Sequence, residues 1–137
     1  MSTEKNKWID ALGKLLTLTQ EGQLIWATAE PPGSFNSLPH QRVDVVYQTR
    51  YKDRTLRLFE LYHKVEKPKG LTVFMDQYDN TQYPYWTKIT VLQLLDENGL
   101  AAWTFPETEV LNHLLEAVKY QVTGVKDFLD EILAEAV

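Results

Sequence analysis

Three histidines, His40, His63 and His113, are the side chains in this sequence best suited to bind a transition metal or to move a proton near neutral pH. None of them belongs to a pair with metal-ligand spacing such as His-x-x-x-His. We expect His63 on a strand near Glu60 and His113 on a helix near Glu116, so a Glu/His site brought together by folding stays open. The spacing itself is typical of solvated histidines and predicts no metal centre.

No sequence motif for covalent catalysis or for phosphate binding accompanies the histidines. The absence of cysteine excludes thiolate nucleophiles, zinc–thiolate sites and disulfides. The serines lie outside any nucleophile elbow, and the glycines do not cluster as a phosphate-binding loop requires. The segment Asp76–Asn80 has some acceptors of a calcium loop but lacks its alternating acids, central glycine and closing glutamate. We therefore expect no cofactor and no enzymatic activity.

Basic side chains crowd the tip of one predicted hairpin, at Arg50, Lys52, Arg54 and Arg57. Guanidinium and ammonium groups that lie close together bind phosphate or carboxylate groups, so this tip is a candidate anion-binding site. A small anionic ligand would need a concave pocket that reaches both Arg50 and Arg57. The alternative interpretation is that these charges keep the hairpin from pairing with a neighbouring strand.

The densest aromatic cluster outside a periodic element consists of Tyr78, Tyr83, Tyr85 and Trp86, stiffened by Pro84. Tyrosine and tryptophan offer a large contact area at a small entropic cost and are frequent at protein interfaces. We predict that these side chains lie in a polar loop over residues 76–86 and contact a protein partner. The alternative is a lid that folds back over the sheet.

The elements that position these groups follow from the periodicity of apolar residues. Helical spacing predicts a helix over residues 4–20, which Gly22 ends in a left-handed conformation. Alternating or continuous apolar runs predict short strands over Gln23–Thr28, Val43–Tyr51, Leu56–Val65 and Leu71–Met75.

The turn between the second and third of these strands decides their register. If Asp53-Arg54 forms the turn, Arg50 lies opposite Arg57, which is an unfavourable pair of like charges. The apolar residues of the third strand also change parity between Leu58 and Phe59. This change indicates either a bulge or a strand that is covered on both faces.

A second hairpin is marked by Asn98-Gly99 between two apolar runs, residues 89–95 and 100–105. Asn-Gly tolerates the two successive positive φ angles of a two-residue type I′ turn. This turn fixes the register, with Leu94 opposite Trp103, and predicts a hairpin in the centre of the sheet. Its strongly apolar face consists of Leu92, Leu94, Trp103 and Phe105.

The sequence ends with a long amphipathic helix that begins at Pro106–Glu109 and is weakened at Gly124. Its apolar seam consists of Leu111, Leu115, Val118, Val122, Val125, Leu129, Ile132 and Ala136. A helix of roughly 28 residues is about 42 Å long, more than the diameter of a globule of this size. Either it breaks near Gly124 into two packed pieces, or its distal half projects and buries Val125, Leu129 and Ile132 against a second protomer. We expect a homodimer in which this helix takes part.

Charge is distributed unevenly: residues 1–70 contain 11 Lys/Arg and 8 Asp/Glu, and residues 71–137 contain 3 and 11. The net charge of −5 argues against nucleic-acid binding, which needs many cations to neutralise phosphates. The acidic half favours self-association or a basic protein partner. Because the charged first residues are followed by no apolar stretch of signal-peptide or membrane-span length, we expect a cytoplasmic protein, with a single domain over residues 1–137.

The sequence also resembles a group of small uncharacterised bacterial α+β proteins. The similarity is carried by Leu16–Trp26, with its Thr-x-x-Gly-x-Leu-x-Trp junction, by Tyr51 and residues 56–61, by the Asp-Glu-Asn-Gly turn and by Val125–Leu133. The resemblance covers most of the chain and implies an N-terminal helix, a meander and a terminal helix. It implies no activity and no functional residue.

Together these patterns predict an α+β fold, with an antiparallel β-meander of five or six strands, an N-terminal helix and a long C-terminal helix packed on the sheet. They favour a non-catalytic protein-interaction module whose partner is another protein or a second copy of the chain. Two alternatives stay open. One is an immunity or inhibitor protein whose acidic half covers a basic toxin; the other is a binding protein or enzyme for a small anion at the basic hairpin.

Overall fold

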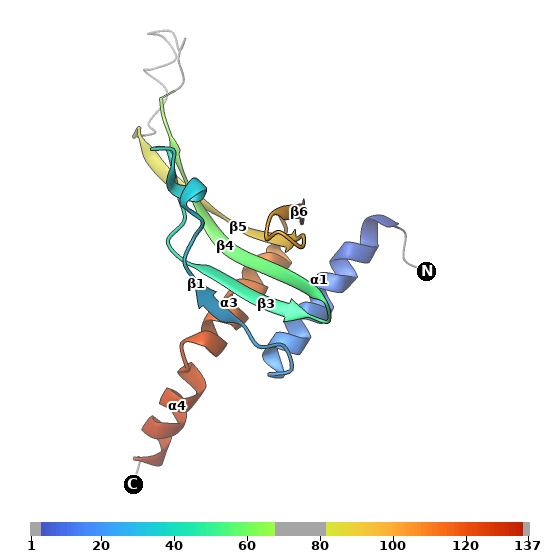
Figure 1. Cartoon of the computed structure of the whole chain (residues 1–137). Helices are drawn as coiled ribbons and strands as arrows, with labels where there is room; N and C mark the ends of the chain where they lie inside the picture. Colours follow the sequence, from blue (N-terminus) through green and yellow to red (C-terminus); the bar gives the residue numbers. More distant parts are fainter. Residues whose placement is uncertain (1–3, 68–81, 136–137) are drawn as a thin grey trace.

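A computed structural model of the chain describes residues 4–67 and 82–135 and confirms the α+β fold (Figure 1). The predicted strand Leu71–Met75, the segment Asp76–Asn80 and Tyr78 lie outside these residues. The described elements are α1 (Glu4–Gln20), β1 (Ala27–Ala29), the 3-10 helix η1 (Gly33–Asn36), β2 (Gln41–Arg42), β3 (Val46–Tyr51), β4 (Arg54–Val65), β5 (Tyr85–Leu95), β6 (Ala101–Thr104), α3 (Glu109–Val122) and α4 (Val125–Ala134).

The strands form a six-stranded antiparallel sheet in the order β1-β3-β4-β5-β6, and β2 pairs with β4. β4 and β5 pair along their whole length, from Thr55 opposite Leu95 to Val65 opposite Tyr85. β3 accompanies β4 only as far as Phe59. The remaining parts of β4 and β5, residues 61–65 and 85–89, therefore extend as a two-stranded ribbon with β2 at its side (Figure 1).

The turn between β3 and β4 corrects the predicted register. Tyr51 pairs with Arg54, so the turn residues are Lys52 and Asp53, not Asp53 and Arg54, the turn considered from the sequence. Lys52 adopts a positive φ of 55°, which lets the chain reverse one residue earlier. As a result Arg57 lies opposite Gln48, and the unfavourable arginine pair does not form.

The predicted strand Val43–Tyr51 is shorter than expected and begins only at Val46. The reason lies in Asn36 of η1, whose side-chain amide donates to the Val43 carbonyl at 3.0 Å and accepts from the Val43 N–H at 2.8 Å. These bonds satisfy the Val43 backbone outside the sheet, so β2 and β3 are separate strands. The strand predicted at Gln23–Thr28 is likewise reduced to β1.

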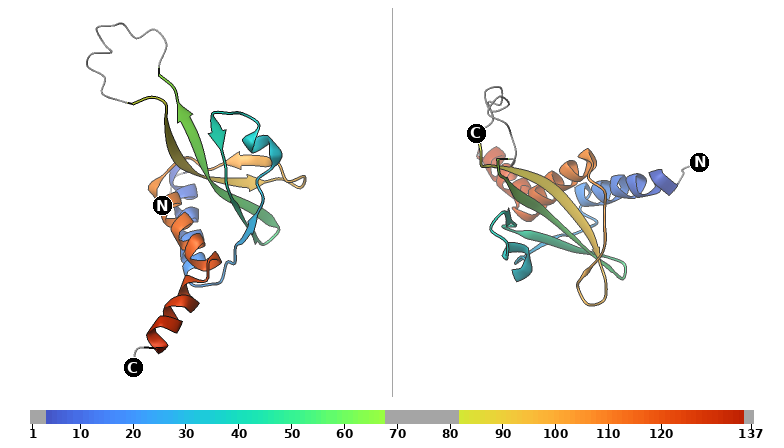
Figure 2. Two further views of the ribbon diagram at one scale, coloured as in Figure 1. Left: turned by 90° about the vertical axis from the view of Figure 1, so that its left-hand side faces the viewer. Right: turned by 90° about the horizontal axis from the view of Figure 1, so that it is seen from above.

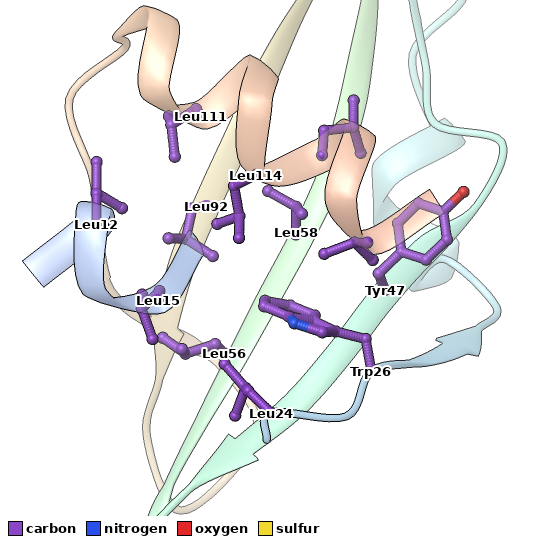
Figure 3. Packing of buried hydrophobic residues seen from close by; sticks show 12 residues of the cluster. Leu12, Leu15, Leu24, Trp26, Tyr47, Leu56, Leu58, Leu92, Leu111 and Leu114 are labelled. Atoms are coloured by element: carbon purple, nitrogen blue, oxygen red, sulfur yellow. The ribbon is translucent and has the colours of Figure 1, made fainter. Parts of the chain in front are cut away.

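The main core lies between one face of the sheet and a layer formed by α1 and α3, which run side by side (Figure 2). Figure 3 shows leucines of both helices meeting the sheet around Trp26 and Tyr47. The buried side chains of this core are Leu12, Leu15, Leu24, Trp26, Tyr47, Leu56, Leu58, Leu92, Leu111, Leu114, Leu115 and Val118.

A smaller core covers part of the opposite face and explains the parity change in β4. Phe59 is buried there with Val43, Val46 and Val91, while the ring of Phe35 from η1 lies against it at 5.0 Å between centroids. The register of β4 with both neighbours is regular at this point. Of the two predicted explanations, cover on both faces is the correct one.

The β5–β6 hairpin keeps the predicted pairing of Leu94 with Trp103, but its turn is different. Gly99 has a φ of 81°, whereas Asn98 does not adopt a positive φ, so the type I′ turn is wrong. The Asp96 carboxylate accepts from the backbone N–H groups of Asn98 and Leu100, which makes a three-residue loop, and a bulge restores the register.

The hairpin is also not central, because β6 is the edge strand of the sheet. Trp103 was expected in the apolar face under the C-terminal helix, but it is 45% exposed and lies against the ring of Phe105 at 4.6 Å. An edge strand has a neighbour on one side only, so its side chains receive less cover. Leu92, on the interior strand β5, is fully buried as predicted.

The C-terminal helix breaks at Gly124, as its sequence predicts. Gly124 adopts a φ of 70° between the end of α3 and the start of α4, a conformation that favours glycine. Four residues of α3 are buried, but none of α4 is. Figure 1 and the left view of Figure 2 show α4 extending away from the sheet beyond α3.

Candidate interaction surfaces

The histidines do not assemble a metal centre in the part of the chain that the structure describes. His40 and His63 lie edge to face with their ring centroids 5.8 Å apart, beside the ribbon. His113 is remote from both, on α3, in a groove between α3 and the end of α1. The rim of this groove carries the acidic residues Glu21, Glu116 and Asp127.

The basic hairpin tip is divided by the fold. Arg50 and Arg54 border a shallow depression that also contains acidic groups. Arg57 is only 6% exposed and lies elsewhere, under the ring of Phe35 at 4.8 Å, with Nε and Nη2 both donating to Gln93 Oε1. Desolvation lowers the pKa of Arg57. Arg57 does not line the depression that Arg50 and Arg54 border, so this depression does not join Arg57 to the other two arginines.

Two residues of the aromatic cluster, Tyr85 and Trp86, lie on a strand and not in a loop, since β5 begins at Tyr85. Tyr83 contacts Tyr85 at 5.5 Å between ring centroids. Trp86, one residue further along β5, projects from the other side of the ribbon because successive side chains of a strand alternate. The structure therefore separates Tyr85 and Trp86 onto opposite faces.

Trp86 belongs to a mixed aromatic and basic surface that sequence reasoning missed. In the register, Trp86 pairs with Lys64, and Tyr62 pairs with both Lys88 and Arg42, which places all five on one face. The Arg42 guanidinium lies over the Tyr62 ring at 4.7 Å and over the Trp86 ring at 5.4 Å. We call these five residues the ribbon platform.

The ribbon platform is open to solvent. Trp86 is 45% exposed, and the three basic side chains are exposed or partly exposed. Arg42 and Lys64 form ion pairs with Asp44 at 3.0 Å and with Glu66 at 3.6 Å, respectively. Exposed pairs of this kind contribute little free energy, so they leave these cations able to bind other carboxylates.

Glu60 marks the boundary between the ribbon platform and the helix layer. Its carboxylate accepts from Lys119 of α3 at 2.9 Å and pairs with Lys88 at 3.1 Å. Burial alone raises the pKa of Glu60, but the hydrogen bonds and positive charges of the two lysines outweigh it, and the pKa lies below its ordinary value. The hydrogen bond to Glu60 in turn raises the pKa of Lys119. Glu60 thus fixes α3 on the face that carries the platform.

A second uncovered surface is the apolar side of α4, which we call the α4 stripe: Val125, Phe128, Leu129, Ile132 and Leu133. The last four are between 42% and 72% exposed. Over residues 125–135 one lysine accompanies four carboxylates, so the rest of the helix is acidic. Val125, Leu129 and Ile132 were predicted from their spacing; Phe128 and Leu133 make the stripe broader than a two-stranded coiled-coil seam.

The Thr-x-x-Gly-x-Leu-x-Trp junction has a structural role. Trp26 Nε1 donates to Thr19 Oγ1 at 3.0 Å, and Gly22 turns the chain at a φ of 75°. Gln121 of α3 joins this junction: its Oε1 accepts from the Trp26 N–H at 2.7 Å, and its Nε2 donates to the carbonyls of Leu24 at 2.9 Å and Thr19 at 3.3 Å. These bonds hold α1, β1 and α3 together.

Comparisons with family models, with curated proteins and with solved structures gave no match to this chain. Within the described ranges, none of the helices has the length and apolar character needed to span a membrane. The ribbon platform and the α4 stripe are the two exposed surfaces of the described residues that are candidates for contact with another protein.

Proposed function

We propose that this protein is a non-catalytic protein-interaction module that self-associates through the α4 stripe. The observation that carries the proposal is a ten-residue helix with no buried residue and a broad exposed apolar side. An isolated helix of this length is marginal in water, so α4 gains stability when a partner covers its apolar side. Exposed contiguous apolar surface of this kind is typical of contact sites.

Light scattering over a micromolar concentration range tests self-association. We expect a dimer that dissociates on dilution, and a monomer after the substitution Leu129→Asp. The matched control is Leu100→Asp, at an exposed leucine of the β5–β6 turn, which should leave the dimer unchanged. A wild-type protein that stays monomeric at all concentrations would contradict the proposal.

A second candidate function is that of an inhibitor or immunity protein for a basic toxin. The observation that favours it is the acidic character of α4 around its apolar stripe. A toxin gene next to the gene of this protein, with a product that binds the wild type but not Leu129→Asp, would support this role. Self-association without such a neighbour would leave the first proposal in place.

A further inference from the structure

We infer that the surface that receives the α4 stripe is the ribbon platform of a second copy, so that two chains exchange α4 helices reciprocally. The inference rests on the proposed self-association and identifies the other half of the contact. Four observations lead to it: the face that carries the platform, the charges of the two surfaces, the area that each arrangement buries, and the shape of the chain.

The ribbon platform continues the face of the sheet on which helices already pack. Glu60 binds Lys119 of α3 on this face, and Tyr62 and Lys64 follow Glu60 at alternate positions of β4. Beyond Glu60, however, the described helices leave Trp86 and its neighbours exposed. A helix placed on the platform would occupy the position next to the one that α3 occupies on the rest of the sheet.

The charges of the two surfaces are complementary. Residues 125–135 contain one Lys against four Asp/Glu, and residues 40–67 contain seven Lys/Arg against four Asp/Glu. On the platform, Arg42, Lys64 and Lys88 border the rings of Tyr62 and Trp86. An acidic helix with an apolar side meets aromatic surface there, with cations within reach of its carboxylates. Two α4 helices packed on each other would bring like charges together.

The buried surface areas also favour the packing of each α4 stripe on the ribbon platform of the other copy. At about 200 Å² for a large apolar side chain, the exposed fractions of the α4 stripe correspond to roughly 450 Å². Two stripes packed only on each other would bury roughly 900 Å², which is below the range of about 1,200–2,000 Å² for stable interfaces. In reciprocal exchange each stripe covers a platform area of about its own size, so two stripes and two platforms together bury roughly 1,800 Å², which lies within that range.

The shape of the chain permits a closed dimer. The ribbon and α4 extend from opposite ends of the molecule in Figure 1 and in the left view of Figure 2. A two-fold axis between two antiparallel copies therefore brings each α4 to the ribbon of the other copy. Because the same contact is made twice, the assembly ends at two chains and does not continue as a filament.

Substitutions on the platform test the inference by sedimentation or light scattering. Trp86→Ala should raise the dimer dissociation constant more than about tenfold, since each dimer loses the ring twice. Lys64→Glu should weaken the dimer as well, and Glu131→Lys in the same chain should restore part of the affinity. The matched control is Lys14→Glu on α1, which makes the same change in net charge at an exposed position and should have no effect. Circular dichroism checks that each variant is folded.

Mixing two variants separates reciprocal exchange from pairing between α4 helices. Trp86→Ala retains its α4 and Leu129→Asp retains its platform, so a mixture of the two should associate through one intact contact. This heterodimer should be weaker than the wild-type dimer but tighter than the dimer of either variant alone. Salt provides an independent readout: from about 0.1 M to about 1 M salt the exchanged dimer should weaken, whereas a contact between two acidic helices should strengthen. A dimer that Leu129→Asp abolishes but Trp86→Ala leaves unchanged would overturn the inference and leave the proposed function intact. A wild type that is always monomeric would overturn both.

Discussion

Gln121 provides the sharpest test of how the two helical segments are held to the sheet. Its amide makes three hydrogen bonds to the backbone of the Thr19–Trp26 junction, at 2.7, 2.9 and 3.3 Å. The substitution Gln121→Leu keeps the size and the helix propensity of the side chain but removes all three bonds. One backbone N–H and two carbonyls then lose their partner in a partly buried region.

The expected loss in the free energy of unfolding follows from the number of hydrogen bonds that Gln121→Leu removes. Each contributes about 1 kcal/mol net, and a backbone group left without a partner after desolvation costs about 1–3 kcal/mol. Because the 3.3 Å bond is long, we expect Gln121→Leu to lower the free energy of unfolding by about 2–4 kcal/mol. For a domain of this size that corresponds to a fall in Tm of about 10 °C.

Chemical denaturation followed by far-ultraviolet circular dichroism measures this loss. Gln20→Leu, at an exposed glutamine of α1, is the control and should change the free energy of unfolding by less than about 0.5 kcal/mol. Gln121→Glu should keep the bond from Trp26 but lose both donated bonds, and so give a separate, substantial loss. If Gln121→Leu proves as stable as Gln20→Leu, the reasoning about the junction is refuted.

Three further predictions concern single groups described above. Glu60→Gln should lower the free energy of unfolding by about 1.5–3 kcal/mol at neutral pH. Because the pKa of Glu60 is lowered in the folded state, the stabilisation by the Glu60 carboxylate is lost as the pH falls through that pKa. The denaturation curves of the variant and the wild type should therefore converge in acid. Gly124→Ala places a side chain at a φ of 70° and should lower the stability of the α3–α4 connection by about 1–2 kcal/mol. Amide hydrogen exchange of α4 measures this loss, which should be smaller for Gly124→Asn. Thr19→Val leaves the indole N–H of Trp26 without an acceptor and should lower the free energy of unfolding by about 1–3 kcal/mol, whereas Thr19→Ser should be close to wild type in the same titration.

Local signals in the sequence predicted the helices well. The bounds of α1, the start of α3 and the break at Gly124 all follow from periodicity, capping residues and glycine. The pairing of Leu94 with Trp103 was also correct, although the turn that produces it is a different one. These features depend on neighbours in the sequence, which is why a single sequence contains them.

The ribbon platform and the position of Arg57 depend on long-range pairing and were much harder to predict than the α4 stripe. Arg42 reaches Tyr62 and Trp86 only because β2 pairs with the far end of β4, a contact that no local pattern indicates. Arg57 was expected at an exposed tip with Arg50, but a shift of register and the cover provided by Phe35 bury it. The alternation of apolar and polar residues along a strand distinguishes the two faces of that strand. It does not show which of the two faces a distant segment of the chain covers.

Because α4 has no buried residue, the contact surface proposed here is separate from the hydrophobic core of the chain. Substitutions along α4 should therefore alter the proposed contact at almost no cost to the packing between the sheet, α1 and α3. Such a segment is free to diversify, because new specificities do not have to be compatible with an existing core. Replacing residues 125–135 by another amphipathic helix should therefore redirect the protein to a different target while the rest of the molecule folds as before.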